Sequence, residues 1–364
     1  MLKTFDDVLT IRNGKNQKAV ENPDGRYPIY GSGGVMGWAD DYICGENTVV
    51  IGRKGSINNP IFVEEPFWNV DTAFGLVADE KQLLPRYLYY FCRYFDFEKL
   101  NTTVTIPSLT KANLLKIQIE VPDKNQQAEI IERLQSVEKL VALRKEQLTK
   151  LDNLVKARFV EMFGNFVFEK NRWETCTVGD VAGTVDPQPS HRTPPAVADG
   201  IPYIGIAECN YTTLQVDFEK ARKVSQDVLD EHLNRYTLAD GDFIIGKIGT
   251  IGKPFFIPCK QNYTLSANTV LIQPDSSKVY PNFLFSLFQS EYMDRIIDSE
   301  KKSTSQPAFG IQKVRAIEIP LPPMRLQKQY ADFCKQVDKS KVVVQKALDE
   351  AQTLFDSLMQ KYFG

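Results

Sequence analysis

Two short stretches of the chain place glycine, basic and hydroxyl residues in the same order. Residues 50–57 read VIGRKGSI, and residues 244–253 read IIGKIGTIGK. Glycine permits positive φ and lets another molecule approach the bare backbone closely. Arg and Lys beside such a backbone can bind phosphate groups, and Arg can also pair with the edge of guanine. Both stretches are therefore candidate DNA contacts, although a purely structural tight turn would have the same sequence.

A third glycine-rich stretch, YGSGGVMG at 30–37, offers further bare backbone. The segment 183–240 carries Arg192, Lys220, Arg222 and Lys223, which we expect to contribute to the same kind of surface. From the three glycine-rich stretches, the predicted DNA-binding residues are Tyr30, Gly31, Ser32, Gly33, Arg53, Lys54, Gly55, Ser56, Lys247, Gly249, Thr250 and Lys253.

The chain is poor in residues for other chemistry. It has two histidines and six scattered cysteines without a C-x-x-C pair, so we predict no metal site, no catalytic histidine and reduced thiols in the cytoplasm. A Walker A loop is excluded because Pro254 follows Lys253. A magnesium-dependent nuclease would need converging carboxylates, whereas Glu300 lies in the polar, loop-like stretch SEKKSTSQP.

The composition is that of a globular protein with two or three domains. The chain has 364 residues, of which 43% are hydrophobic and 25% charged. It contains no run of about 18 apolar residues, so no membrane span is expected, and its start lacks the apolar region of a secretory signal. The net charge of −2 is unusual for a protein that binds DNA alone, because such proteins generally have a basic excess.

The chain is a tandem repeat. Between residues 100–164 and 300–364, identical residues recur at a constant offset of 200: Pro107 and Pro307, Pro122 and Pro322, Gln127 and Gln327, Phe163 and Phe363, and Gly164 and Gly364. Upstream the offset shrinks, which places insertions in the second copy around 183–240. Such a register indicates a duplication, which leaves function open.

Each copy begins with a mixed segment, 2–122 or 176–322, in which short β-branched and aromatic runs alternate with Gly, Pro and Asn. These runs predict short strands. One helix is predicted in each segment, over 85–100 and 281–297. We expect its many aromatic residues to lie in a core rather than to stack on bases.

A long helix of about 36 residues, ~54 Å in length, is predicted to end each copy. Apolar residues occupy eight of ten positions at strict 4–3 spacing in the first copy, and nine of ten in the second. This spacing is typical of a coiled-coil seam. If the two seams pair, the second helix must run back toward the first domain, so the pair is antiparallel and Gly364 lies near the start of that domain. The first-copy positions are 130, 134, 137, 141, 144, 148, 151, 155, 158 and 162, and the second-copy positions are 200 higher.

We therefore predict an α+β fold with two homologous mixed α/β domains, separated by two long antiparallel coiled-coil helices, and a pseudo-two-fold internal repeat. The predicted divisions are 1–122 (first domain), 123–164 (spacer helix 1), 165–322 (second domain, with a short linker at 165–175) and 323–364 (spacer helix 2).

In this order, the motifs resemble those of the specificity (HsdS) subunit of type I restriction–modification systems. The resembling stretches span nearly the whole chain: YGSGG, IGRKGS and PFWNVDTAF, then IPYIGI, IIGKIGTIG and KKSTSQPAFGIQKVRAIEIPLPP, and the two long helices that end in FG. Ser305 and Gln306 in the last stretch are further DNA-facing candidates. The first copy departs here, because TVTIPSLTKANL lacks the corresponding glutamine.

The resemblance implies that residues 1–122 and 165–322 form target recognition domain 1 and target recognition domain 2, each of which binds half of an interrupted double-stranded DNA sequence. It also implies assembly with two methyltransferase subunits, which carry S-adenosylmethionine and methylate adenine, and in some assemblies with motor–nuclease subunits. The specificity subunit would have no catalysis and no cofactor of its own. Phosphate contacts made by the methyltransferase subunits would account for the net charge of −2. The alternatives are a free-standing tandem DNA-binding regulator, which would bind tightly alone, and a magnesium-dependent nuclease.

Overall fold

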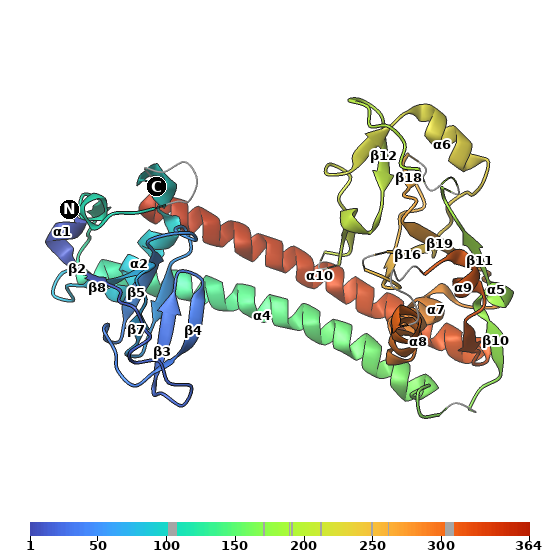
Figure 1. The fold of residues 1–364 in the computed structure, drawn as a ribbon, viewed down its shortest axis with the longest axis horizontal. Helices are drawn as coiled ribbons and strands as arrows, with labels where there is room; N and C mark the ends of the chain where they lie inside the picture. Colours follow the sequence, from blue (N-terminus) through green and yellow to red (C-terminus); the bar gives the residue numbers. More distant parts are fainter. Residues whose placement is uncertain are drawn as a thin grey trace. The chain divides into compact units, whose positions relative to one another are not determined.

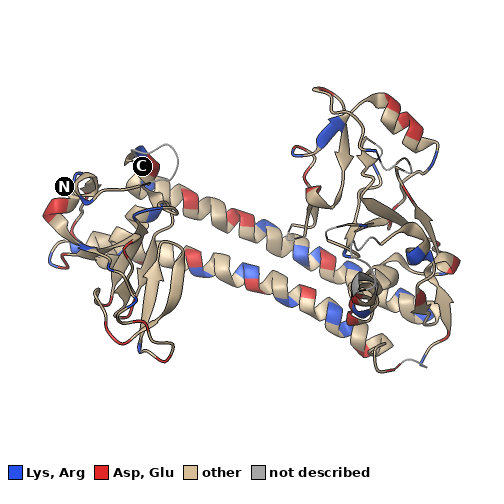
Figure 2. Cartoon of the chain, in the orientation of Figure 1, with Lys and Arg blue, Asp and Glu red and all other residues tan. Residues whose placement is uncertain are grey.

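The computed structural model describes residues 1–100, 108–169, 172–188, 190, 192–211, 213–248, 250–260, 262–302 and 309–364 (Figure 1). It divides into two compact units. The first comprises Met1–Glu146 and Val344–Gly364, and the second comprises Gln147–Val343. Each unit contains one mixed α/β domain and part of both long helices, α4 (Lys124–Phe163) and α10 (Met324–Phe363). Acidic and basic residues are interspersed along both helices (Figure 2).

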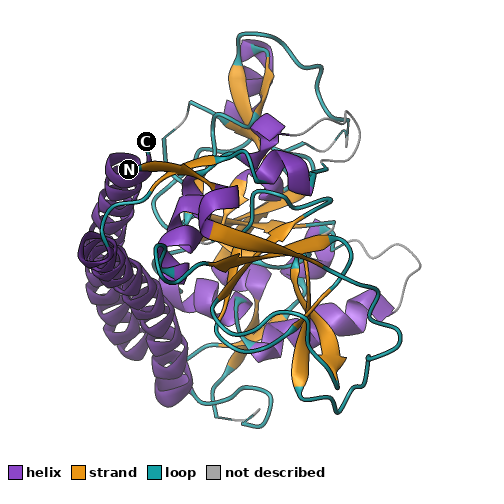
Figure 3. Cartoon of the chain, turned by 90° about the vertical axis from the view of Figure 1, so that its left-hand side faces the viewer, coloured by secondary structure: helices purple, strands orange, loops and turns teal. Residues whose placement is uncertain are grey.

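The first domain combines short strands with short helices (Figure 3). Its main sheet is antiparallel in the order β2-β8-β5-β6, and a second sheet has the order β4-β3-β7 with β3 and β7 parallel. The strands are β1 (Leu2–Thr4), β2 (Leu9–Asn13), β3 (Tyr27–Gly31), β4 (Gly34–Ala39), β5 (Thr48–Gly52), β6 (Ile61–Val63), β7 (Trp68–Asn69), β8 (Ala73–Ala78) and β9 (Gln118–Glu120), which pairs with β1. The helices are α1 (Phe5–Val8), α2 (Pro85–Tyr94), the 3-10 helix η1 (Phe97–Leu100) and α3 (Lys111–Leu114).

The second domain repeats this topology strand for strand. The order β11-β19-β16-β17 corresponds to β2-β8-β5-β6, and β15-β12-β18, with β12 and β18 parallel, corresponds to β4-β3-β7. The strands are β10 (Thr175–Thr177), β11 (Ala182–Val185), β12 (Ile201–Ile204), β15 (Arg222–Val224), β16 (Phe243–Gly246), β17 (Pro254–Phe256), β18 (Thr264–Leu265), β19 (Thr269–Pro274) and β20 (Glu318–Pro320), which pairs with β10. The matching helices are α5 (Val178–Val181), α7 (Pro281–Phe288) and α9 (Ile311–Arg315). The repeat inferred from the sequence is therefore confirmed as a repeat of fold.

The insertion in the second copy adds elements that the first domain does not match. They are the 3-10 helix η2 (Ile206–Glu208), β13 (Cys209–Asn210), β14 (Gln215–Val216) and α6 (Gln226–Leu233). A further helix, α8 (Glu291–Lys302), follows α7.

The single helices predicted over 85–100 and 281–297 are each broken in two. In the first domain Phe95 has extended backbone after α2, and the Asp96 carboxylate accepts the N–H of Glu98 at 3.1 Å to start η1. In the second domain Ser290 donates its hydroxyl to Leu287 O at 2.6 Å between α7 and α8. Both side-chain contacts compete with the backbone hydrogen bonds of a continuous helix. The spacing of apolar residues, on which the prediction of single helices is based, does not reveal these breaks.

The aromatic residues of α2 and α7 are core residues, as expected. Tyr87 and Tyr90 are buried in the first unit, as are Phe283 and Phe288 in the second. Two equivalent glutamines connect these cores to the long helices. Gln127 accepts the N–H of Leu84 at 2.8 Å and Gln327 accepts that of Tyr280 at 2.9 Å, and each donates to the proline carbonyl five residues before it.

The long helices are antiparallel within each unit. In the first unit Leu134 and Val137 pack with Phe355 and Met359, and Arg133 donates to the Tyr362 hydroxyl at 3.2 Å. In the second unit the same arrangement recurs, with Lys341 paired to Asp152 at 2.6 Å and the Arg158 guanidinium 5.8 Å from the centre of the Phe333 ring. All twenty predicted seam positions are buried or half-buried, so the predicted seam is confirmed.

The C-terminal end of each long helix, α4 and α10, packs against the core of a domain. Phe163, at the end of α4, packs on Phe283 of the second domain, with ring centres 4.9 Å apart. Phe363, at the end of α10, packs on Tyr87 of the first domain at 5.1 Å, in a core that also contains Phe5. The chain end therefore lies against the first domain, as the antiparallel arrangement predicts.

Candidate nucleic-acid interface

The two glycine turns share one close approach, between their first glycine and the carbonyl oxygen four residues further on. Each follows the first strand of a main-sheet hairpin, which is β5 in the pair β5–β6 and β16 in the pair β16–β17. A Cβ atom on Gly52 would lie 2.3 Å from the carbonyl oxygen of Ser56, and one on Gly246 would lie 2.3 Å from that of Thr250. No side chain fits at that distance, so both turns require glycine for structural reasons.

A second segment lies directly against each turn. In the first domain this segment is the β3–β4 connection: a Cβ on Gly52 would lie 3.0 Å from the Cβ of Ser32. In the second domain a Cβ on Gly246 would lie 3.3 Å from Cγ1 of Ile206. The structure thus brings the candidate residues at 30–33 next to the candidate turn at 52–56.

A third segment fixes the turns through backbone hydrogen bonds. The N–H groups of Arg53 and Lys54 both donate to Thr72 O, at 2.8 and 3.3 Å, and the N–H of Lys247 donates to Asn268 O at 2.8 Å. These amides are therefore used inside the protein. Because these N–H groups already donate to carbonyl oxygens, the candidate contacts of the turns are their exposed side chains.

In the first domain most candidates face solvent. Arg53, Lys54, Gly55, Ser56 and Gly33 are exposed, and Ser32 is half-buried. The remaining two candidates of this domain, Tyr30 and Gly31, lie beneath the exposed residues: Tyr30 is half-buried and Gly31 is buried. Tyr30 packs edge-on against Phe67 with ring centres 5.3 Å apart, and burial, aided by the charge of Glu65, raises the pKa of its hydroxyl. Gly31 is buried against Met36, whose sulfur would lie 2.5 Å from an added Cβ.

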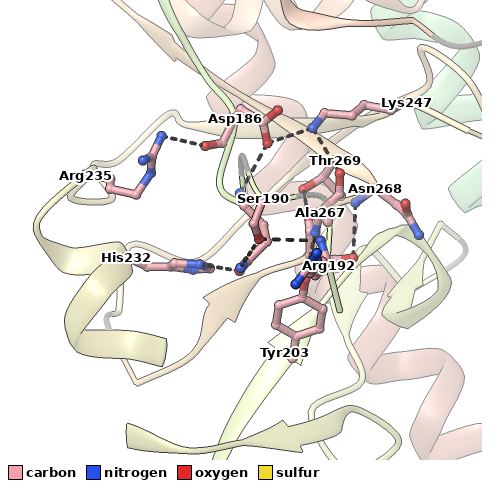
Figure 4. Close-up of polar contacts among 12 residues, drawn as sticks. Asp186, Ser190, Arg192, Tyr203, His232, Arg235, Lys247, Ala267, Asn268 and Thr269 are labelled. Atoms are coloured by element: carbon pink, nitrogen blue, oxygen red, sulfur yellow. Dashed lines mark hydrogen bonds and ion pairs between the residues drawn. The ribbon is translucent and has the colours of Figure 1, made fainter. Parts of the chain in front are cut away.

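In the second domain Lys247 is buried, and its side chain points toward Asp186 (Figure 4). Lys247 is 6% exposed. Its Nζ lies 2.8 Å from Oδ1 of Asp186 and donates to Ala267 O at 2.9 Å. The expectation that Lys247 contacts DNA is therefore corrected: its charge ties the turn to the segment after β11. The equivalent Arg53 remains exposed and lies 5.8 Å from the centre of the Phe74 ring.

Of the other candidates in the second domain, two are exposed and three lie outside the described residues. Thr250 and Lys253 are exposed, with the Lys253 ammonium 3.9 Å above the Tyr211 ring. Gly249, Ser305 and Gln306 lie outside the described residues. For Lys247, no sequence pattern indicated Asp186 as a partner, since the two residues are far apart in the chain and neither stands in a spacing that predicts contact.

The described residues also bear on metal binding, histidine chemistry and membrane insertion. Within the described ranges no three His, Cys, Asp or Glu side chains come together as a metal site. The second histidine, His232, is buried and hydrogen-bonded to Thr264 and, at 2.7 Å, to Gln188. Nor does any helix in the described part of the chain have the length and apolar character needed to cross a membrane.

The fold and this surface define a tandem of two equivalent α/β domains, each followed by a coiled-coil helix and each presenting a glycine turn beside exposed polar side chains. The model of the type I restriction modification DNA specificity domain matches residues 1–153 and 170–351. The chain therefore belongs to the family of type I restriction–modification DNA specificity subunits, and the resemblance noted in its motifs is confirmed.

Individual relatives agree with this assignment. The chain is 24% identical over 323 residues to the type I restriction enzyme MjaVIII specificity subunit of Methanocaldococcus jannaschii, covering 82% of this chain and 74% of that protein. Its fold is similar to that of the S subunit of a type I restriction–modification system from M. genitalium, with a TM-score of 0.61 and 16% identity over 100% of this chain and 96% of the other. A second solved structure, described in connection with complex assembly and conformational transition of the type I system, has a TM-score of 0.57 at 14% identity and covers 100% of this chain and 97% of that one.

Proposed function

We propose that the two domains bind the two halves of an interrupted, asymmetric DNA sequence, one half each. The observation that carries this proposal is that one fold, repeated, presents different side chains at equivalent positions. Ile29 and Tyr203 are equivalent, because each is the first residue of its strand to pair with the parallel strand, and each also pairs with the antiparallel strand of the same sheet. Their antiparallel partners differ completely: Gly37 in the first domain and Arg222 in the second. Two different surfaces on one scaffold favour two different half-sites.

The turns differ in the same way. Lys54 in the first domain stands where Ile248, which is 60% exposed, stands in the second, since each is the second residue after the first glycine of its turn. We infer that Arg53, Lys54 and Ser56 contact DNA in the first domain, and Thr250 and Lys253 in the second. Lysines in such positions contribute affinity through phosphate, whereas sequence discrimination requires groups that contact base edges.

The chain itself is proposed to be non-catalytic and to hold no cofactor. Two methyltransferase subunits, which carry S-adenosylmethionine, would bind to it and supply the chemistry, and motor–nuclease subunits would join where the system also restricts DNA. This assembly is supported by the net charge of −2, because a duplex held by this chain alone would meet little excess positive charge.

Selection from a library of random duplexes tests the proposal. The full chain is purified alone and together with the methyltransferase subunit of its own system, and bound duplexes are sequenced. We expect the complex to enrich two short, different sequences at a fixed gap, and the chain alone to bind weakly. Tight binding by the chain alone to one uninterrupted sequence would instead favour a free-standing regulator. Cleavage of the duplexes by the chain with Mg²⁺ would contradict a non-catalytic role.

A further inference from the structure

A hollow opens beside the glycine turn of the second domain. Its volume is about 420 Å³. Strands β12 and β15, helix η2, the turn after β16 and the segment after β18 all contribute to its lining. The lining residues that carry the argument are Tyr203, Glu208, Arg222, Thr250, Ser266 and Asn268.

Arg222 supplies positive charge to this hollow. It is exposed at the first position of β15. Within the described ranges no ion pair or hydrogen bond joins its guanidinium to another residue. Its five N–H donors are therefore available to a ligand, in the planar arrangement that suits two acceptors side by side.

Glu208 supplies a carboxylate to the same hollow. One of its oxygens accepts the N–H of Gly205 at 2.7 Å, which fixes the side chain at the start of η2. Glu208 and Arg222, both within the described ranges, form no ion pair with each other. The hollow thus offers a donor group and an acceptor group at separate places.

Other residues of the lining are held in place by the protein's own hydrogen bonds. The hydroxyl of Tyr203, a residue that is 5% exposed, accepts the N–H of Ala267 at 2.8 Å (Figure 4). The Ser266 hydroxyl accepts the N–H of Asn268 at 3.3 Å. A site that is formed before its ligand binds loses little conformational freedom on binding, which favours specificity.

The charges of Arg222 and Glu208 favour one of two parts of DNA, the phosphate backbone or a base edge, as the ligand of this hollow. A phosphate group would be repelled by the carboxylate of Glu208. The major-groove edge of a G·C pair fits both groups, because guanine presents the acceptors N7 and O6 and cytosine presents the N4 amino donor. We propose that this hollow takes the major-groove edge of a G·C base pair, with Arg222 donating to guanine and Glu208 accepting from cytosine. The inference rests on the proposed function, since it requires the second domain to bind one half of the target.

The test maps adenine methylation across the genome of a host that carries the full chain with the methyltransferase subunit of its own system. Arg222→Met removes the donors, and Arg222→Lys keeps the charge but not the planar pair of donors. Both variants should lose discrimination at one G·C position in one half of the motif and leave the other half unchanged. On duplexes that carry G·C or A·T at this position, the ratio of binding affinities should fall about 10- to 100-fold.

Two further variants sharpen the result. Glu208→Gln keeps an acceptor for the Gly205 N–H but removes the negative charge, and it should relax the same base pair as Arg222→Lys. Lys260→Met removes an exposed charge of the same domain outside the hollow and should leave the motif unchanged. An unchanged motif with Arg222→Lys would assign Arg222 to phosphate and overturn the inference, as would relaxation of a different base pair by Glu208→Gln. If the wild-type complex produced no interrupted motif, the proposed function itself would fail, which is a distinguishable outcome.

Discussion

Replacing Lys247 with Met should loosen the glycine turn of the second domain rather than remove a contact with DNA. The Lys247 side chain is 8% exposed and that of Asp186 is 15% exposed, with 2.8 Å between ammonium and carboxylate. Removing one partner of a buried pair leaves the other charge unpaired and costs about 3–5 kcal/mol. Because Asp186 keeps some access to water, we expect a value near the lower end, about 3 kcal/mol.

Hydrogen exchange measures this loss locally, which matters because a chain of two compact units need not unfold in one step. The reporting amides are those of residue 247, bonded to Asn268 O, and of Phe309, bonded to Lys247 O. Their protection should fall about 100-fold in the variant. The equivalent amides of the first domain, those of Arg53 and Leu109, provide the internal control and should not change.

A double variant separates the unpaired charge from other effects. Lys247→Met combined with Asp186→Leu replaces the pair by apolar groups, which is often close to neutral for stability. It should therefore recover most of the lost protection. If Lys247→Met left protection unchanged and instead reduced the salt dependence of DNA binding by about one phosphate contact, Lys247 would be an exposed ligand of DNA and our assignment would be wrong.

Three other predictions concern the glycine turns, the helix seam and a buried histidine. Gly246→Ala places a Cβ 2.3 Å from a carbonyl oxygen, so selection from random duplexes should show loss of one half-site only, and Gly52→Ala should remove the other half. Phe355→Ala should lower the free energy of unfolding of the first unit by about 3–5 kcal/mol, because Phe355 is 4% exposed in the helix seam. Urea unfolding measures this loss. Replacement of Phe168 by Ala should have little effect, because Phe168 is 75% exposed. Burial lowers the pKa of His232 below its usual value near 6.5, so its neutral form stabilises the fold fully above about pH 6.5 and this contribution is lost as the pH falls through the lower pKa of the folded state. Thermal unfolding of His232→Leu between pH 7.5 and 5.5 should lack that pH-dependent component.

The sequence predicts the repeat and the seam because both follow from periodic patterns. A constant offset of 200 residues aligns buried Gln127 with buried Gln327, and the 4–3 spacing identifies the helix faces that are buried. The helices are 40 residues long rather than about 36, because they begin earlier than the apolar seam does. Pattern arguments locate a packed face well and the first turn of a helix poorly.

The candidate site could be predicted only in part. The glycine turns were found because glycine and basic residues recur, and Ser32 was found through its glycine neighbours. Lys247 has the same sequence context as Arg53, yet its carboxylate partner comes from a distant strand end, which no local pattern shows. The sequence shows Arg222 only as a basic residue of the insertion. The hollow that Arg222 lines is formed by five segments that are separate in the sequence, so no local pattern predicts it.

The most direct test of the central claim is the map of methylated adenines in a host that expresses this chain with the methyltransferase subunit of its own system. Two related domains with different surfaces should produce a motif of two short, unlike words at a constant gap, and a variant in one domain should alter only one word. A single uninterrupted word, or a change in both words caused by a variant in one domain, would contradict the account.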